Sequence, residues 1–424
     1  MERNLLEVPK GKSKWIRVGK LLDGLNQPIQ NAHLVYNHGQ ILHASKETPP
    51  KELVNKDQTT PDLDLPDFII LPGLIEAHAH LFLEGGELNF EKRKKYLENN
   101  PDWFLDQAKN RLEKLVSLGI VGYRDAGDKL GVGLALSRMY ENKNGKIMPY
   151  VDSPGAAIHH LGRYGTFMAD PLEDHDSISE CIQDRIRKGA DRIKLIPTGI
   201  INFKQGKVTK EPQMTTQEII ELVETSKLYR KQTFAHASGY EGIDRVIDGG
   251  ADSVEHGYFI REDQLSRMRD QQVAWVPTFA PVQKQVDHAD RIGWEDLIKK
   301  NLQNVLDGHA KSLRQAHEKG VIVIAGSDAG SMGVAHGKDF YYELELMERA
   351  GFDSLSVINS ATGVSSSRLE YKELFGMLKP GYKSRFIVTK NSPLDTVSNL
   401  RKHKYVFYDG HVLESNENTD TSGL

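Results

Sequence analysis

Five polar residues follow apolar runs of this sequence in a pattern that could build a metal site. Each residue alone is more often structural, as a hydrogen-bonded core histidine or an aspartate that caps a turn. Imidazole and carboxylate are the ligands that zinc prefers, so a metal site explains the five together better. They are His78 and His80 in "LPGLIEAHAHL", His236 in "QTFAHASG", His256 in "SVEHGYF" and Asp328 in "VIVIAGSDAG".

A lysine stands among these residues in a place that is costly for a charge. Lys194 lies in the middle of the apolar run "RIKLIPTG", and buried lysines are normally paired or neutral. A protonated amine has no lone pair for a metal ion. A neutral amine can react with carbon dioxide to give a carbamate, whose two oxygens could bridge two metals. An ion pair with a carboxylate, Asp328 for instance, explains the lysine equally well at this point.

The elements that would position these side chains alternate between strand-like and helix-like patterns. Stretches with helical spacing, such as "TTQEIIELVETSKLYRKQ", separate most of the apolar runs, which predicts a (β/α)₈ TIM barrel. The side chains at i and i+2 of a strand point the same way, so His78 and His80 should both face the interior. The runs cover residues 68–81, 119–128, 150–160, 192–199, 232–239, 253–259, 273–280 and 321–330.

Short strand patterns at both ends of the chain predict a second, smaller domain. They occupy residues 15–44 and 384–414, and we expect them to form one small β-sandwich-like domain beside the barrel. Residues 46–66 are polar and contain prolines, which predicts a loop. The predicted divisions are 1–66 and 376–424 for the small β domain, the latter ending in a disordered tail over 415–424, and 67–375 for the barrel.

Composition limits the classes of function. The 424 residues carry a net charge of -4, with 38% hydrophobic and 27% charged residues, so no basic footprint for nucleic acid stands out. Cys181 is the single cysteine. No apolar stretch reaches the length of about 18 residues that a membrane span needs, and the first residues lack a signal peptide's apolar core. We therefore expect a cytoplasmic protein that binds a small molecule but neither nucleic acid nor membrane. The sequence is compatible with a homo-oligomer.

The ordered set of motifs resembles the amidohydrolase superfamily, in the subgroup with imidazolonepropionase-like, Xaa-Pro dipeptidase-like and arginine carboxypeptidase-like members. Besides the runs quoted above, "HGKDFYYELELMERAGF" at 336–352 and "SATG" at 360–363 carry the resemblance. It implies a metal-dependent barrel enzyme with two zinc ions. It also implies the ligands: His78, His80 and Asp328 for the first metal, carboxylated Lys194 as the bridge, and His236 and His256 for the second metal.

The resemblance implies hydrolysis of an amide-type C–N bond in a dipeptide, N-acyl amino acid, urea or carbamate. A hydroxide shared by the metals would attack the carbonyl, and Asp328 would carry the proton to the leaving nitrogen. A mononuclear deaminase or cyclic-amide hydrolase is the alternative, although the glutamate usual in such deaminases is Gly239 here. A non-catalytic scaffold on the same fold is a third possibility, but this chain keeps all six residues.

The sequence departs from the family pattern near the site. Glu76 replaces the usual aspartate before the first histidine pair. Dipeptidase-like members often carry a Gly-Gly-His-Gly segment that helps to bind the substrate carboxylate, whereas "GRYG" at 162–165 places Tyr164 at the histidine position. This puts dipeptidase specificity in doubt. We take His160, Tyr164 and Tyr240 as candidates for substrate binding, with ordinary loop roles as the alternative.

Overall fold

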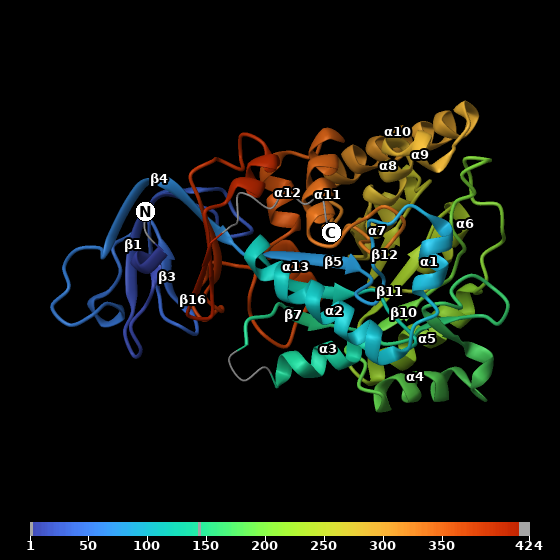
Figure 1. The fold of residues 1–424 in the computed structure, drawn as a ribbon, viewed down its shortest axis with the longest axis horizontal. Helices are drawn as coiled ribbons and strands as arrows, with labels where there is room; N and C mark the ends of the chain where they lie inside the picture. The colour runs from blue at the N-terminus through green and yellow to red at the C-terminus, as the bar shows by residue number, and fades with distance from the viewer. Residues whose placement is uncertain (1–2, 143–145, 415–424) are drawn as a thin grey trace.

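The computed structural model describes residues 3–142 and 146–414, so the expected tail at 415–424 lies outside the described residues. Figure 1 shows a strand-rich part at one end of the molecule and, at the other, helices around parallel strands. Within the described ranges, no helix is both long enough and apolar enough to cross a membrane. The cytoplasmic location stays a prediction.

The strand-rich part is a single seven-stranded sheet that draws on both ends of the chain. Strand β4 pairs in parallel with β1 and antiparallel with β14, which joins the N-terminal strands to the C-terminal ones. The order across the sheet is β16 (His411–Glu414), β15 (Tyr405–Tyr408), β14 (Arg385–Thr389), β4 (Leu63–Pro72), β1 (Lys14–Leu21), β2 (Ile29–Tyr36) and β3 (Ile41–Ser45).

Strand β4 begins inside the segment predicted as a loop, and the boundary expected at residue 66 falls within it. Phe68 and Ile70 belong to the apolar core of the seven-stranded sheet, whereas Ile69 and Leu71 belong to the core of the larger part. A strand buried on both faces reads as a continuous apolar run. For this reason the sequence pattern could not separate β4 from the strand that follows it.

The larger part contains two parallel sheets. Backbone hydrogen bonds join them at two places: Asp191 N–H donates to Ser153 O at 2.8 Å, and the 321–330 run lies between β13 and β5. One sheet has the order β5 (Leu74–Ala79), β6 (Ile120–Asp125) and β7 (Tyr150–Asp152), and the other β13 (Ala274–Val276), β12 (Ser253–His256), β11 (Thr233–Ala237), β10 (Ile193–Leu195), β8 (Ala157–His159) and β9 (Ala169–Pro171).

Two of the predicted strands are less regular than expected. The 150–160 run divides into β7 and β8, with Pro154 and Gly155 between them. The 321–330 run forms isolated bridges from Val323 to Trp275 and from Ala329 to Ala79 rather than a named strand. The backbone of Asp328 has a φ of 56° there, and a left-handed residue interrupts an extended chain.

Helices follow most of the parallel strands. Thr215 caps α5 in a capping box with Glu218, as the pattern "TTQE" indicates. The helices are α1 (Phe90–Tyr96), α2 (Pro101–Leu115), α3 (Val132–Glu141), α4 (Ile178–Arg187), α5 (Thr216–Leu228), α6 (Tyr240–Asp248), α7 (Glu262–Asp270), α8 (Ala280–Asp287), α9 (Ala289–Ile292), α10 (Asp296–Lys319), α11 (Lys338–Arg349), α12 (Ser354–Ser360) and α13 (Gly363–Leu369); short 3₁₀ turns cover Arg3–Leu6, Lys51–Leu53, Val116–Leu118, Leu172–Asp174 and Val397–Lys402.

The arrangement is a TIM-barrel-like α/β fold with an additional β part. In Figure 1 the arrowhead of β5 points away from the seven-stranded sheet and toward α1. The parallel pairing gives the neighbouring strands of each sheet the same direction, so their carboxyl ends share one side. This is the side where such folds place their chemistry.

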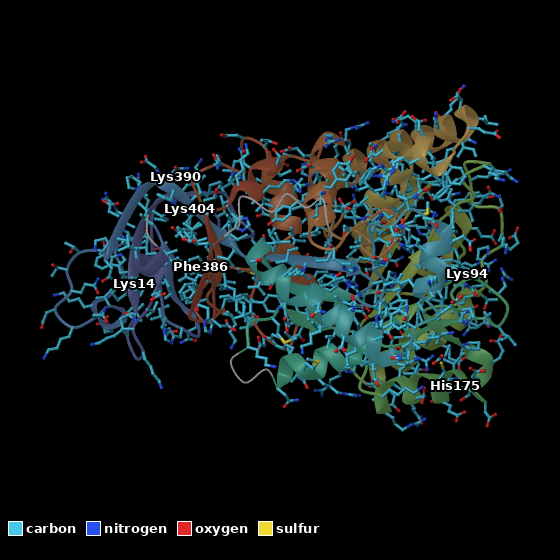
Figure 2. The ribbon with its side chains drawn as sticks, in the orientation of Figure 1. Lys14, Lys94, His175, Phe386, Lys390 and Lys404 are labelled. Atoms are coloured by element: carbon cyan, nitrogen blue, oxygen red, sulfur yellow. The ribbon has the colours of Figure 1, made fainter. Side chains whose placement is uncertain are left out.

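The small sheet has its own aromatic core, which predicts a stability effect that should spare the site. Phe386, labelled in Figure 2, is fully buried, and its ring centroid lies 5.0 Å from that of Phe407 and 4.9 Å from that of Tyr36. Phe386→Ala should lower the free energy of unfolding by about 3–5 kcal/mol, measured by chemical denaturation. Phe386→Leu, which keeps most of the apolar volume, should cost clearly less. Equal stability of the alanine variant and the parent would contradict this packing.

Candidate active site

One cavity of about 480 Å³ is lined by all six residues predicted to form the metal site. It lies at the carboxyl ends of the parallel strands, because His78, Lys194, His236 and His256 lie near the ends of β5, β10, β11 and β12. The six side chains come from segments up to 250 residues apart, and each of these residues is at most 8% exposed: His78, His80, Lys194, His236, His256 and Asp328.

His78, His80 and Asp328 form a compact group in the lining of this cavity. The Nε2 atoms of His78 and His80 lie 3.8 and 3.6 Å from Oδ1 of Asp328. One ligand atom from each residue lies within 4.8 Å of the others, so the group could hold a metal ion. Gly326 allows this approach, because a Cβ at its position would lie 2.9 Å from the backbone nitrogen of His78.

His236 and His256 extend the group along the strand ends. Their ring centroids are 4.4 Å apart, and the ring of His256 lies 4.9 Å from that of His78. Thr278 holds His256 by a 2.8 Å contact between its Oγ1 and Nδ1 of the ring. The His236 ring contacts the carbonyl oxygen of Gly199 through Nε2 at 3.4 Å.

The four imidazoles are neutral at physiological pH. Burial is the main cause: it lowers the pKa of His80 and of His236 to about 3 and holds the pKa values of His78 and His256 well below 6.5. Neutral imidazole is the form that offers a lone pair to a metal. The site therefore brings together four imidazoles that could each bind a metal ion without losing a proton at neutral pH.

The structure adds Glu255, which the sequence reasoning missed. Its Oε2 atom lies 2.5 Å from Nδ1 of His78 and accepts a 2.8 Å hydrogen bond from Nη2 of Arg124. The Ser253 hydroxyl donates to the other carboxylate oxygen at 2.5 Å. A proton on Nδ1 of His78 leaves the lone pair on Nε2, which faces Asp328. The available signal was a glutamate inside the short apolar strand "SVEH".

Glu76 takes a structural position beside the site. Its carboxylate accepts hydrogen bonds from the backbone N–H of His78 and of Ser327 at 3.1 and 3.0 Å. The Ser327 hydroxyl adds a 2.6 Å hydrogen bond. Burial raises the pKa of Glu76 to about 8. The glutamate thus connects β5 to the segment that carries Asp328. This connection explains why a carboxylate is found at residue 76, where the family usually has an aspartate.

Lys194 is buried without a polar partner. Its amine has no hydrogen-bond partner among the described residues, and the residue is 2% exposed. The nearest aromatic contact places Nζ 4.6 Å from the ring centroid of Phe234. Burial, the largest cause, lowers the pKa of the amine to about 8. The ion pair with Asp328 that was one explanation of this lysine is not formed in the described structure.

Asp328 lies beside the histidine group and has an unusually high pKa for an aspartate. Burial raises its pKa to about 7, and the Ser331 hydroxyl donates to Oδ2 at 2.8 Å. Asp328 and His256 both have left-handed backbones, with φ of 56° and 67°. Such conformations cost about 1–3 kcal/mol each and cluster at functional sites.

The three candidates for substrate binding lie in different places. Tyr164 lines the cavity, and its ring centroid lies 5.4 Å from that of His236. His160 lies outside the lining, where its ring nitrogens pair with Glu173 at 2.7 Å and with Glu218 at 3.2 Å. Tyr240 is also outside the lining and is 59% exposed. Of the three, the structure brings Tyr164 alone into the cavity that the six predicted metal ligands line.

The walls of the cavity are mainly apolar and come from segments that the sequence reasoning did not single out. Besides the six predicted residues, Arg93 from α1 is the one charged residue of the described lining. Its neighbours in the lining include Phe90, Leu97, Phe167, Ile200, Phe203 and Trp294. No strand pattern marks these residues, because they lie on helices and loops beyond the strand ends.

Comparison with known proteins identifies the family. The model of the amidohydrolase family matches residues 69–413, and the chain belongs to this family, which makes it a hydrolase. An uncharacterized protein of Mycobacterium tuberculosis is 25% identical over 293 residues, which cover 69% of this chain and 72% of that protein.

Two solved structures share the fold over nearly the whole chain. A Xaa-Pro dipeptidase with methionine bound in its active site matches with a TM-score of 0.76 and 24% identity, covering 95% of this chain and 100% of that chain. The ochratoxinase of A. niger matches with a TM-score of 0.78 and 22% identity, covering 96% of each. At these levels of sequence identity, the structural similarity shows that the fold is shared.

The contact between Glu255 and His78 predicts an effect on metal affinity. Glu255→Gln should weaken the binding of a divalent metal by about 10- to 100-fold, because residues that orient a ligating histidine typically contribute that much. Competition with a chelator measures the dissociation constant. Glu224→Gln, on the exposed side of α5, is the matched control and should bind as the parent does. Unchanged affinity in the Glu255 variant would show that this carboxylate does not orient the ring.

Proposed function

We propose that this protein is a metal-dependent hydrolase that cleaves an amide-type C–N bond of a small molecule with two divalent metal ions, zinc being the first candidate. The observation that carries the proposal is the Lys194 amine, buried without a partner beside four neutral histidines and an aspartate. The closed eight-stranded barrel expected from the sequence belongs to the same proposal, as does the division of the chain into a barrel and a small β domain built from both ends.

The residues present fit a two-metal centre. His78, His80 and Asp328 would hold one ion, and His236 and His256 the other. A cationic lysine between them would repel both metals, and no described group neutralises it. If the neutral amine attacks carbon dioxide, an N–C bond forms and one proton leaves, so the side chain becomes a carbamate anion with two oxygens. This single change removes the buried positive charge and supplies the missing bridge.

Bound metal ions would polarise the scissile carbonyl and activate water. Asp328 would accept the proton of that water and deliver it to the leaving nitrogen. The Ser331 hydroxyl holds one oxygen of this carboxylate and leaves the other facing the two imidazoles. The apolar walls would exclude bulk water and strengthen the electrostatic interactions inside. Dipeptides, N-acyl amino acids, ureas and carbamates all have a bond of the required kind.

A mononuclear deaminase or cyclic-amide hydrolase is the second candidate. The observation that favours it is the compactness of His78, His80 and Asp328, which form the one group of this kind in the described part of the chain with ligand atoms within 4.8 Å of one another. One metal ion per chain and an unmodified lysine would support this alternative.

Replacing the lysine should remove the second metal. Lys194→Ala should bind about one zinc per chain or fewer, measured by elemental analysis, where the parent binds about two. The parent should also show a carbamate signal by ¹³C NMR in labelled bicarbonate, and short carboxylic acids should restore part of the lost rate in the variant. Lys227→Ala, on the exposed side of α5, is the control. Two metals retained in Lys194→Ala would contradict the bridge.

Replacing the aspartate should separate proton transfer from binding. Asp328→Asn should lose about 10²–10⁴-fold in turnover, the usual contribution of general acid–base catalysis. The rate is measured with the best substrate from a screen of dipeptides, N-acyl amino acids and aryl ureas, on protein whose metal content has been determined. Near-normal turnover with metal bound would mean that another group moves the proton.

A further inference from the structure

We propose that Arg93 binds a carboxylate of the substrate, so that the site selects anionic amides with an apolar body. This inference rests on the proposed function for the reaction itself. It assigns a specificity-determining role to a residue of α1, outside the set of predicted metal ligands. The arguments are the face of the helix on which Arg93 lies, its free hydrogen-bonding capacity and its position beside Asp328.

Helix α1 presents two different faces. Phe90, Arg93 and Leu97 line the cavity, and their spacing of three and four residues places them on one side of the helix. Lys92 and Lys94 are exposed on its other side. Figure 2 shows Lys94 at the α1 end of the molecule, far from Lys14 in the small sheet. One guanidinium of this basic helix therefore turns inward, between two apolar side chains.

The guanidinium of Arg93 retains most of its capacity to donate. Its Nη2 donates to the carbonyl oxygen of Gly330 at 2.9 Å, and among the described residues no carboxylate contacts it as an ion pair, although the charges of Glu84, Asp328 and Glu87 act on it from farther away. A guanidinium has five N–H donors in a planar fork that matches a carboxylate. Lys194 and Arg93 are the two basic side chains, lysine or arginine, in the described cavity lining. An anion entering this apolar space would find its counter-charge there.

The contact with Gly330 places Arg93 beside the reacting groups. Gly330 lies two residues after Asp328, and the charge of Arg93 is felt at both Asp328 and His80. In an amide of an α-amino acid, the carboxylate is attached to the carbon next to the scissile nitrogen. A carboxylate held by Arg93 would thus bring that nitrogen toward Asp328, which is proposed to protonate it. The aromatic and aliphatic walls would take the apolar body of the substrate.

Arg93 could instead serve as a clamp that fixes α1 to the Gly330 segment. The two roles differ in their dependence on ligand charge. A clamp would affect charged and neutral ligands to the same extent, whereas a carboxylate-binding residue would affect the charged ligand alone. A pair of ligands that differ in this group therefore separates the roles.

The test uses N-(phenylsulfonyl)-L-phenylalanine and the corresponding neutral alcohol, N-(phenylsulfonyl)-L-phenylalaninol, neither of which contains an amide bond that could be hydrolysed. Their dissociation constants are measured by calorimetry on the zinc-loaded full chain. Arg93→Gln should weaken binding of the carboxylate by about 10- to 100-fold, the value of a hydrogen bond to a charged group. It should change binding of the alcohol by less than about threefold. Arg93→Lys should recover part of the loss, and Lys94→Gln should match the parent with both ligands.

Equal weakening of both ligands in Arg93→Gln would overturn the inference in favour of a clamp. Unchanged binding of the carboxylate, or a parent protein that binds neither ligand, would also overturn it. Because the ligands do not react, the result is independent of turnover. Charge-dependent binding without any amide hydrolysis would uphold Arg93 and reject the proposed function. Amide hydrolysis with charge-independent binding would do the reverse.

Discussion

The arrangement of the site depends on one constraint, the burial of the Lys194 amine without a hydrogen-bond or ion-pair partner among the described residues. The nearest carboxylates are occupied: Glu255 is shared by His78 and Arg124, and Asp328 faces the two imidazoles of His78 and His80. A permanent charge in such a place is strongly disfavoured. Among the described residues the surrounding chain offers neutral imidazoles and an apolar ring but no carboxylate in direct contact with the amine, so we propose that the lysine itself is the group that changes.

The fold brings about this constraint through backbone features rather than through packing alone. Parallel strands bring His78, Lys194, His236 and His256 to one side of the molecule. Close approach at Gly326 lets the Asp328 segment lie against β5, and Glu76 holds that segment by two hydrogen bonds from Ser327. The left-handed backbones at His256 and Asp328 turn the chain where the strands end. The seven-stranded sheet has its own core and lies away from the cavity.

The sequence predicted more of the site than of its surroundings, for physical reasons. Strand ends share a side, so a polar residue after each apolar run could be placed without knowing the loops; the cavity is lined by all six. Strand β4 was not predicted as a separate strand, because burial on both faces removes the alternation of apolar and polar residues that would mark its boundary. Glu255 was not predicted, because its role depends on contacts with His78 and Arg124, which lie 177 and 131 positions away in the sequence. Arg93 and the apolar wall residues were not predicted either. They lie on helices and loops, and the sequence does not show which side of these segments faces the cavity.

The central claim is tested most directly by anomalous diffraction from crystals of the zinc-loaded protein grown with bicarbonate. The account predicts two zinc peaks about 3.5–4 Å apart, the spacing usual in two-metal sites. It also predicts electron density that continues beyond Nζ of Lys194 and lies between the two peaks. A single peak, with density that ends at the amine, would contradict the two-metal centre and the carboxylated lysine together.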